Sequence, residues 1–354
     1  MTDTPQAIHP RPRSVHDVLF APSTRGVLIA ASKNPDAKLT FIVTPPAGVY
    51  PAGPLGPVAV KIPATAAAGD AVEHEGRVLV QLHAAQLGTI ADTLPRYVET
   101  VDSDGLPALV STALRGTPMS VRYNHWLHTA RPARVAEDFA LAGGWLRRFQ
   151  AATAGERTGF DWAADVCDRL RKRWPAHPQL DAALVRLTSA DHQLSNHLAR
   201  RTAVHGDYWF GNLLVADGTI SGVVDWEGGA SDGWPLRDLV RFALSYSLYL
   251  DRHTRPGHRV LGHRGLRRDG FAPGVTYALL GQGWLPELVR SFLCNGLTEL
   301  GLPPDLWYHA AVTGIGEVAA LANNDVFGAA HLGLLAGLSP STTPHDRQEG
   351  LVRP

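Results

Sequence analysis

Cysteine and net charge are both scarce in this chain of 354 residues. Its two cysteines, Cys167 and Cys294, lie far apart and form no disulfide framework, metal motif or redox motif. Lys plus Arg number 33 and Asp plus Glu number 33, so net charge gives no reason to expect nucleic acid or a membrane surface as a partner. We interpret the cysteines as buried thiols of a cytoplasmic protein.

Long apolar segments are missing as well. No apolar run approaches the roughly 18 residues of a membrane-spanning helix, and the first residues lack the basic start and apolar stretch of a signal peptide. Composition is otherwise that of a globular protein, with 45% hydrophobic and 19% charged residues. Because a chain of this length outgrows a single core, we expect two lobes. Oligomeric state stays open.

The segment from residue 203 to 227 carries the candidate chemistry. Two short apolar runs flank Asp217-Gly218, a pair typical of a two-residue hairpin turn. Asp207 and Asn212 precede this hairpin and Asp225 follows it, so we expect the hairpin to bring Asp225 back beside the other two. One carboxylate can accept a proton from a hydroxyl, and an amide oxygen with a second carboxylate can hold Mg2+. These are the groups that phosphoryl transfer needs.

The ordered set His205-Gly206-Asp207, Asn212 and Val224-Asp225-Trp226-Glu227 resembles the catalytic core of the aminoglycoside phosphotransferase and choline kinase-like family. It is also similar to the H-R-D-x-x-x-x-N and D-F-G elements of protein kinases. The resemblance implies an α+β, two-lobe protein kinase-like fold with a small five-stranded antiparallel sheet lobe and a larger, mainly helical lobe. It also implies that Asp207 is the catalytic base and that Asn212 and Asp225 hold Mg2+, with ATP or GTP as co-substrate.

Within an expected nucleotide-binding lobe at residues 14–114, Lys61 lies in an apolar strand that resembles the V-A-I-K strand of kinases. The resemblance assigns Lys61 to the nucleotide phosphates. It also assigns Glu75, four residues before Leu79 on the following helix, as the partner of Lys61, with Glu73 as the fallback. The ordinary alternatives are an edge-strand lysine and a solvated helical glutamate.

Two further pairs of nucleotide-contacting residues are expected from position alone. The turn after the first strand has no glycine, yet Ser32 and Asn34 offer hydrogen bonds to phosphate; an ordinary hairpin turn explains them equally well. The resemblance places the hinge between the lobes after the last strand, where backbone groups of Ser111 and Ala113 would contact adenine. The glycine- and proline-rich piece at 48–57 is interpreted as a loop between strands.

The expected catalytic and acceptor-binding lobe spans residues 115–338. We also expect a flexible N-terminal arm at residues 1–13, before the first lobe, and a flexible tail at residues 339–354. Gly233 to Leu239 resembles the family element G-x-P-x-x-D-L, in which Asp238 would brace the backbone of the catalytic loop. His205 has the same expected bracing role. Glu227, two residues after Asp225, is a further supporting candidate near metal or substrate.

The acceptor is the least determined part of the prediction. Residues 251–268 alternate Arg with His and are interpreted either as a solvated loop or as a flap over the acceptor. From Ala243 to Leu338 there are seven Arg and no Lys against seven Asp plus Glu, without the acidic excess that a polycationic aminoglycoside would favour. A sugar, nucleoside or glycosylated natural product is therefore favoured over an aminoglycoside. A choline cage would use Trp284, Trp307 and Tyr308, although buried core is the favoured use of all three.

Together these features predict a Mg-dependent O-phosphotransferase that acts on a hydroxyl of a small molecule, with antibiotic inactivation as one role. The alternatives are a metabolic kinase of the sugar, choline or homoserine type and a nucleotide-binding pseudoenzyme. A protein kinase is disfavoured because Asp238 lies only thirteen positions after Asp225, which is too close for an activation segment in between. The choice of acceptor, of hydroxyl, and of ATP or GTP stays open.

Overall fold

The computed structural model describes residues 13–32, 37–45 and 56–338. The chain divides into two compact units. Unit 1 comprises residues 1–115 and 224–228, and unit 2 comprises residues 116–223 and 229–354. This division falls one residue after the lobe boundary expected from the sequence, and it assigns 224–228 to the first unit. The expected tail at 339–354, the arm apart from Arg13, and nearly all of the loop at 48–57 lie outside the described residues.

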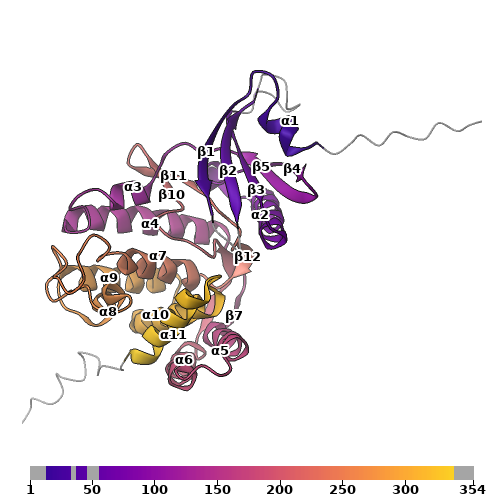
Figure 1. Ribbon diagram of the computed structural model, residues 1–354. Helices are drawn as coiled ribbons and strands as arrows, with labels where there is room; N and C mark the ends of the chain where they lie inside the picture. Colours follow the sequence, from indigo (N-terminus) through magenta and orange to yellow (C-terminus); the bar gives the residue numbers. More distant parts are fainter. Residues whose placement is uncertain (1–12, 33–36, 46–55, 339–354) are drawn as a thin grey trace, which may run out of the picture. The chain divides into compact units, whose positions relative to one another are not determined.

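Unit 1 is built on a five-stranded antiparallel sheet with the strand order β1-β2-β3-β5-β4. The helix α2 packs on β3, β4 and β5, and Figure 1 shows this sheet in indigo to purple. The predicted small sheet lobe is thereby confirmed. The elements are α1 (Val15–Leu19), β1 (Arg25–Ala31), β2 (Lys38–Thr44), β3 (Val58–Pro63), α2 (Ala66–Ala84), the 3-10 helix η1 (Gly88–Thr93), β4 (Tyr97–Ser103) and β5 (Leu106–Thr112).

Valine alternation explains how this sheet closes its core. Val58 and Val60 on β3 and Val110 on β5 are buried, and they share one cluster with Val43 and Val101 from the flanking strands. The Thr65 side chain caps α2 by accepting a hydrogen bond from the Ala68 N–H. Arg13 does not belong to a loose arm, because it is paired with Glu99 at 2.7 Å and its carbonyl accepts from the Asp102 N–H.

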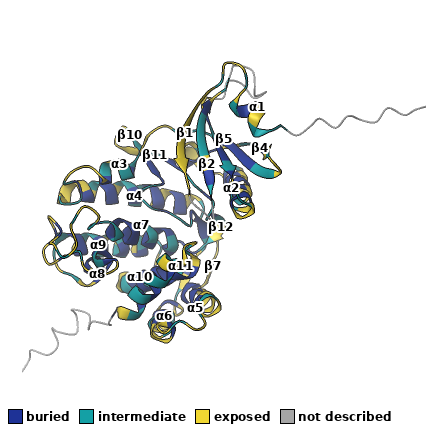
Figure 2. Ribbon diagram, viewed as in Figure 1, coloured by how far each residue is buried: buried dark blue, intermediate teal, exposed yellow. Residues whose placement is uncertain are grey.

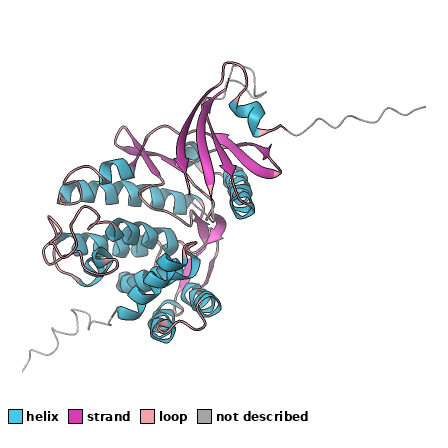
Figure 3. Ribbon diagram, viewed as in Figure 1, coloured by secondary structure: helices cyan, strands magenta, loops and turns pink. Residues whose placement is uncertain are grey.

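Unit 2 is mainly helical, with three small sheets (Figure 3). Its strands are β6 (Thr117–Pro118), β7 (Arg157–Gly159), β8 (Leu198–Arg200), β9 (Thr202–Val204), β10 (Leu213–Ala216), β11 (Thr219–Val223) and β12 (Ala230–Gly233). Its helices are α3 (Met119–Tyr123), α4 (Pro132–Ala152), α5 (Trp162–Arg173), α6 (Leu180–Leu194), α7 (Leu236–Leu248), α8 (Pro273–Leu280), α9 (Trp284–Glu299), the 3-10 helix η2 (Pro304–Leu306), α10 (Trp307–Leu321) and α11 (Asp325–Gly337).

An aromatic core organises unit 2 around α4 and α7, which carry continuous buried faces (Figure 2). Phe139 on α4 meets Phe242 and Tyr246 of α7 edge-on, with ring centroids 5.1 and 5.0 Å apart. Trp145 stacks on Tyr208, the residue after Asp207, with ring centroids 5.5 Å apart. These rings fix the segment that carries Asp207 against the two central helices.

The predicted hairpin is present as β10 and β11, which pair antiparallel. Asp217 and Gly218 both adopt the left-handed conformation, with φ of 50° and 71°, as a two-residue turn of this kind requires. Cys167 is buried as expected, but Cys294 is half-exposed, because it lies beside the buried row of α9 that Val289, Leu293 and Leu297 form. Among the described residues, none of the helices has both the length and the hydropathy needed to cross a membrane.

Candidate active site

Unit 1 holds a compact group of charges around Lys61. The Lys61 Nζ donates to both carboxylate oxygens of Glu75, at 2.7 and 2.6 Å, and to Oδ1 of Asp225 at 2.7 Å. Glu75 comes from the buried face of α2, and its Oε1 also accepts from the Trp226 N–H at 3.2 Å. The structure thus pairs Lys61 with Glu75, whereas Glu73 is exposed and faces Arg77 at 3.9 Å.

Burial and pairing act in opposite directions on the ionisation of these groups. Burial alone lowers the pKa of Lys61, but Asp225 and Glu75 outweigh burial and raise that pKa above its ordinary value. Burial alone raises the pKa of Asp225, yet Lys61 and Lys38 hold it well below its usual range. Both side chains are therefore charged at neutral pH, which is the state needed to attract phosphate or a cation.

Lys38 is a member of this group that the sequence analysis missed. It is buried at the start of β2, its Nζ lies 3.1 Å from Oδ1 of Asp225, and it also contacts Oε2 of Glu227. Burial lowers the pKa of Lys38, but Asp225 leads the interactions that raise it overall. The register of β2 against β3 places Thr40 opposite Lys61, and Lys38, two residues earlier on β2, shares the face of Thr40.

Glu227 faces Lys38 and keeps 28% of its side-chain surface exposed. Its pKa is raised, first by burial and then by the neighbouring Asp225 carboxylate. Asp225 itself adopts the left-handed conformation with φ of 70°, which a non-glycine residue rarely occupies. Such backbone strain is held by surrounding contacts, and here Lys61 and Lys38 supply them.

The residues expected to contact adenine or phosphate by position are less distinctive. The hydroxyl of Ser32 accepts from the Lys38 N–H at 2.9 Å and so closes the turn, while Asn34 lies outside the described residues. Ser111 is buried in β5, paired with both neighbouring strands. The Ala113 N–H donates to the Pro57 carbonyl at 2.9 Å, so adenine would have to share or replace that hydrogen bond.

In unit 2 the loop that carries Asp207 is fixed by a buried carboxylate. Asp238, on the first turn of α7, accepts hydrogen bonds from the backbone N–H groups of His205 at 2.7 Å and Gly206 at 2.9 Å. Burial raises the pKa of Asp238, and His205 with its N–H leads the interactions that oppose this shift. The buried His205 accepts from the Asp207 N–H through Nδ1, at 3.2 Å. Both residues therefore contact the loop backbone.

The Asp207 side chain is oriented by two neighbours, and 36% of it stays exposed. Arg241, also on α7, donates through Nε and Nη2 to Oδ1 of Asp207, at 2.9 and 2.7 Å. The Asn212 Nδ2 donates to the Asp207 carbonyl at 3.0 Å and lies 3.3 Å from its Oδ2. Arg241 was not predicted, although its position three residues after Asp238 places both on one face of a helix.

The donor chemistry of Asn212 and Asp225 fits Mg2+, which prefers oxygen ligands. Asn212 uses its amide nitrogen toward Asp207, which leaves its Oδ1 as an acceptor in unit 2. Oδ1 of Asp225 accepts hydrogen bonds from Lys61 and Lys38. Among the described residues of unit 1, none bonds to its Oδ2. The described residues contain no cluster of three or more His, Cys, Asp or Glu that could hold a metal ion.

The Arg/His-rich segment at 251–268 is a folded loop tied to the body of unit 2. His263 is buried and bonds the Thr129 carbonyl through Nε2 at 2.8 Å, and Arg259 and Arg267 form an isolated bridge. Arg268 donates to the Thr254 carbonyl within the segment. These contacts stabilise one conformation of the segment.

The candidate choline-cage aromatics are not core residues, contrary to the favoured expectation. Trp284, Trp307 and Tyr308 are all half-buried. Trp284 donates to the Gly262 carbonyl at 2.9 Å, and Trp307 lies under the Arg290 guanidinium, with 5.2 Å to the ring centroid. All three lie at the first turns of α9 and α10, where one face meets solvent.

Comparison with known proteins agrees with this architecture. The family model described as "Phosphotransferase enzyme family" matches residues 50–274. A search among curated proteins gave no match. Among solved structures, aminoglycoside phosphotransferase APH(4)-Ia is 12% identical with a TM-score of 0.52, over 90% of this chain and 95% of that one. A thermostable mutant of it, in ternary complex with ADP and hygromycin B, is 12% identical with a TM-score of 0.51, over 89% and 95%.

A third solved structure is macrolide 2'-phosphotransferase MphH from Brachybacterium faecium. It is 16% identical with a TM-score of 0.48, over 90% of this chain and 93% of that one. At such identities the solved structures bear on the fold, and those with the higher TM-scores have the protein kinase-like fold that the sequence motifs predicted.

Proposed function

Since this chain belongs to the phosphotransferase enzyme family, we propose that it transfers the γ-phosphoryl group of ATP or GTP to a hydroxyl of a small molecule. The observation that carries the proposal is the Asp207 carboxylate. It is oriented by Arg241 and Asn212, it sits on a loop braced by Asp238, and a third of its surface stays open to an acceptor. A fixed, accessible carboxylate suits the orientation and deprotonation of a hydroxyl.

In this proposal, the cluster of charged side chains around Lys61 in unit 1 binds the nucleotide. Lys61, held in place by Glu75, offers an ammonium group to the phosphates. We assign Asn212 and Asp225 as Mg2+ ligands from their order in the motifs and from their oxygen donors. When bound, Mg2+ supplies positive charge to the phosphate oxygens. Lys38 bonds both to Asp225 and to Glu227, so it adds a second positive charge beside the Asp225 carboxylate.

The acceptor is proposed to be a neutral or mildly polar molecule such as a sugar, a nucleoside or a glycosylated natural product. The balanced charge of residues 243–338, with seven Arg against seven Asp plus Glu, supports this choice over a polycation. An aminoglycoside stays the second choice, because a fold relative is a complex with hygromycin B. Antibiotic inactivation and a metabolic kinase reaction are the two roles that such an acceptor allows.

A coupled ADP/GDP-release assay with Mg2+ tests the proposal. Its acceptor panel holds aminoglycosides, macrolides, nucleoside antibiotics, simple sugars and choline. Release stimulated by one class, and lowered by about 100-fold or more in Asp207→Asn, supports the assigned base. The matched control is Asp232→Asn, which removes an exposed aspartate of unit 2 that is also paired with an arginine, Arg201 at 3.1 Å.

Two outcomes contradict parts of this assignment. Full activity in Asp207→Asn means that another group activates the hydroxyl. Nucleotide binding with no stimulation by any acceptor favours a nucleotide-binding pseudoenzyme over the transferase.

A further inference from the structure

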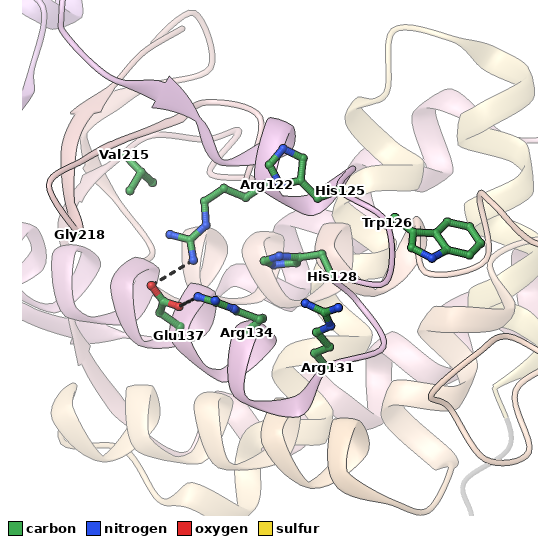
Figure 4. Close-up of a pocket in the computed structure, with 9 residues that line it drawn as sticks. All are labelled: Arg122, His125, Trp126, His128, Arg131, Arg134, Glu137, Val215 and Gly218. Carbon is green, nitrogen blue, oxygen red and sulfur yellow. Dashed lines mark hydrogen bonds and ion pairs between the residues drawn. The ribbon is translucent and has the colours of Figure 1, made fainter.

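Unit 2 contains a cavity of about 450 Å³ that the proposed phosphotransferase chemistry does not use. It opens where the α3–α4 connection, the start of α4 and the β10–β11 turn meet, and its lining side chains are drawn in Figure 4. The lining is rich in cationic side chains. Its residues are Arg122, His125, Trp126, His128, Arg131, Arg134, Glu137, Val215 and Gly218.

Positive charge exceeds negative charge around this cavity. Glu137 is the one carboxylate among the lining residues, and it lies 3.1 Å from Arg122 and 3.4 Å from Arg134, contacts marked by dashes in Figure 4. Arg122 also lies 3.2 Å from the buried Asp138. The two acids thus occupy Arg122 and part of Arg134. Within the described ranges, the guanidinium of Arg131 has no protein partner.

His128 adds a polar atom that is aimed into the cavity. The residue is only 7% exposed, and its Nε2 is bonded to Oδ2 of Asp138 at 2.7 Å. Because an ionised aspartate only accepts, Nε2 must carry the hydrogen of this bond. Within the described chain Nδ1 has no partner, and His128 lines the cavity. Nδ1 is therefore the ring atom that a ligand in the cavity can contact, and it can accept a hydrogen bond from a protonated phosphate oxygen.

The start of α4 adds to the positive electrostatic potential in the cavity. This helix of 21 residues begins after Arg131 with Pro132, has no side-chain cap and has no acidic residue in its first turn. The helix dipole gives this end of α4 a partial positive charge, and Arg131 and Arg134 line the cavity beside it. Two arginines at the positive end of a helix repel one another and the helix dipole, unless an anion binds between them.

We propose that this cavity binds a phosphate-bearing small molecule through Arg131, Arg134 and His128. Guanidinium groups match phosphate oxygens in pairs, and the cavity is larger than one phosphate needs. Trp126, 79% exposed at its rim, offers a ring face on which a nucleobase can stack. The shared chemistry is the phosphate oxyanion, and its two sources are a simple phosphate or a nucleoside phosphate.

Isothermal titration of the full chain with inorganic pyrophosphate, in the absence of Mg2+, tests this site. Arg131→Gln and Arg134→Gln are each expected to weaken binding about tenfold, because each removes a charge-assisted hydrogen bond. The double variant is expected to lose this binding event. Both arginines are exposed, so thermal melting should match wild type. Arg171→Gln on α5, an exposed arginine outside the lining, is the matched control and should bind as wild type does.

Parallel titrations with ADP and adenosine distinguish the two sources. Consider the part of ADP binding that the double variant loses. If its affinity exceeds that of pyrophosphate and decreases in Trp126→Ala, the ligand is a nucleoside phosphate. Equal binding of pyrophosphate and ADP, unchanged in Trp126→Ala, identifies a simple phosphate. Identical pyrophosphate titrations of wild type and the double variant overturn the proposal. Binding of pyrophosphate to the unit 1 charge group would persist in the double variant, so the two sites are separated.

Discussion

Arg241 donates two hydrogen bonds to a single carboxylate oxygen, Oδ1 of Asp207, at 2.9 Å from Nε and 2.7 Å from Nη2. Three residues earlier on α7, Asp238 accepts from the backbone of the same loop. One helix face therefore fixes both the backbone and the carboxylate of the proposed base. It also leaves the second oxygen, Oδ2, toward Asn212.

Arg241 is expected to be a positioning residue for Asp207. Arg241→Met should lower kcat about ten- to 100-fold with little change in the KM for nucleotide, because a misplaced base costs rate more than binding. Arg241→Lys should restore part of the loss, since it keeps the charge but not the forked geometry. Steady-state kinetics measures both, with Arg201→Gln as the control for an exposed Arg–Asp pair. A kcat unchanged in Arg241→Met would contradict the role.

Glu75 is expected to contribute to stability as well as to phosphate binding. Glu75→Ala leaves the buried Lys61 with one partner fewer, so the free energy of unfolding should fall by about 3–5 kcal/mol. Glu73→Ala on the same helix is the matched control and should change it by under about 0.5 kcal/mol, because its pair with Arg77 is exposed. Urea unfolding measures both. Equal small effects would mean that Lys61 finds a substitute partner.

The small lobe was predictable because its information is local. Short runs of apolar and β-branched residues separated by turn residues indicate the strands, and the apolar residues of α2 recur at the helical period, so the expected five-stranded sheet is the observed one. The pairing of Lys61 with Glu75 could be anticipated because Glu75 lies four residues before Leu79, the position at which the resembled family carries its glutamate. Arg13 was misassigned because its partners, Glu99 and Asp102, lie about 86 residues away in sequence.

Lys38 and Arg241 show where the sequence was insufficient. A lysine that starts a strand resembles an ordinary edge residue, and only the register of β2 against β3 shows that Lys38 shares a face with Lys61. Arg241 lies in an apolar helix on the same face as Asp238, which the family motif had identified. That spacing indicates a shared helix face, but it does not indicate that Arg241 pairs with Asp207. The burial of Trp284, Trp307 and Tyr308 depends on which faces of α9 and α10 pack against the core. Composition does not determine those faces, and all three side chains are half-buried.

His331 is expected to make stability depend on pH. Burial lowers its pKa to about 4, and its positively charged neighbour Arg241 acts in the same direction. Its ring meets Phe271 and Phe327, and its Nδ1 is bonded to the Phe327 carbonyl. The native state therefore binds fewer protons than the unfolded chain between pH 6.5 and 4. This costs up to about 3 kcal/mol as pH falls through that window.

Urea unfolding between pH 4 and 7 measures this dependence. His331→Met should flatten the slope in that window, whatever it does to stability at pH 7. His192→Gln, which removes an exposed histidine of α6, should keep the wild-type slope. His263 and His309, whose pKa values burial also lowers, contribute to the slope that remains. An unchanged slope in His331→Met would show that this side chain is protonated in the native state.

Lys38 is expected to compete with Mg2+ for Asp225. Its Nζ lies 3.1 Å from Oδ1, the oxygen already bonded to Lys61, and it also contacts Glu227. Lys38→Gln removes one of the two cations at that carboxylate and keeps a polar side chain. The Mg2+ concentration for half-maximal thermal stabilisation of the protein should then fall several-fold, because one positive charge fewer repels Mg2+ at that carboxylate. Asp225→Asn should raise it instead. A higher Mg2+ requirement in Lys38→Gln would show that Lys38 orients Asp225 for the metal rather than competing with it.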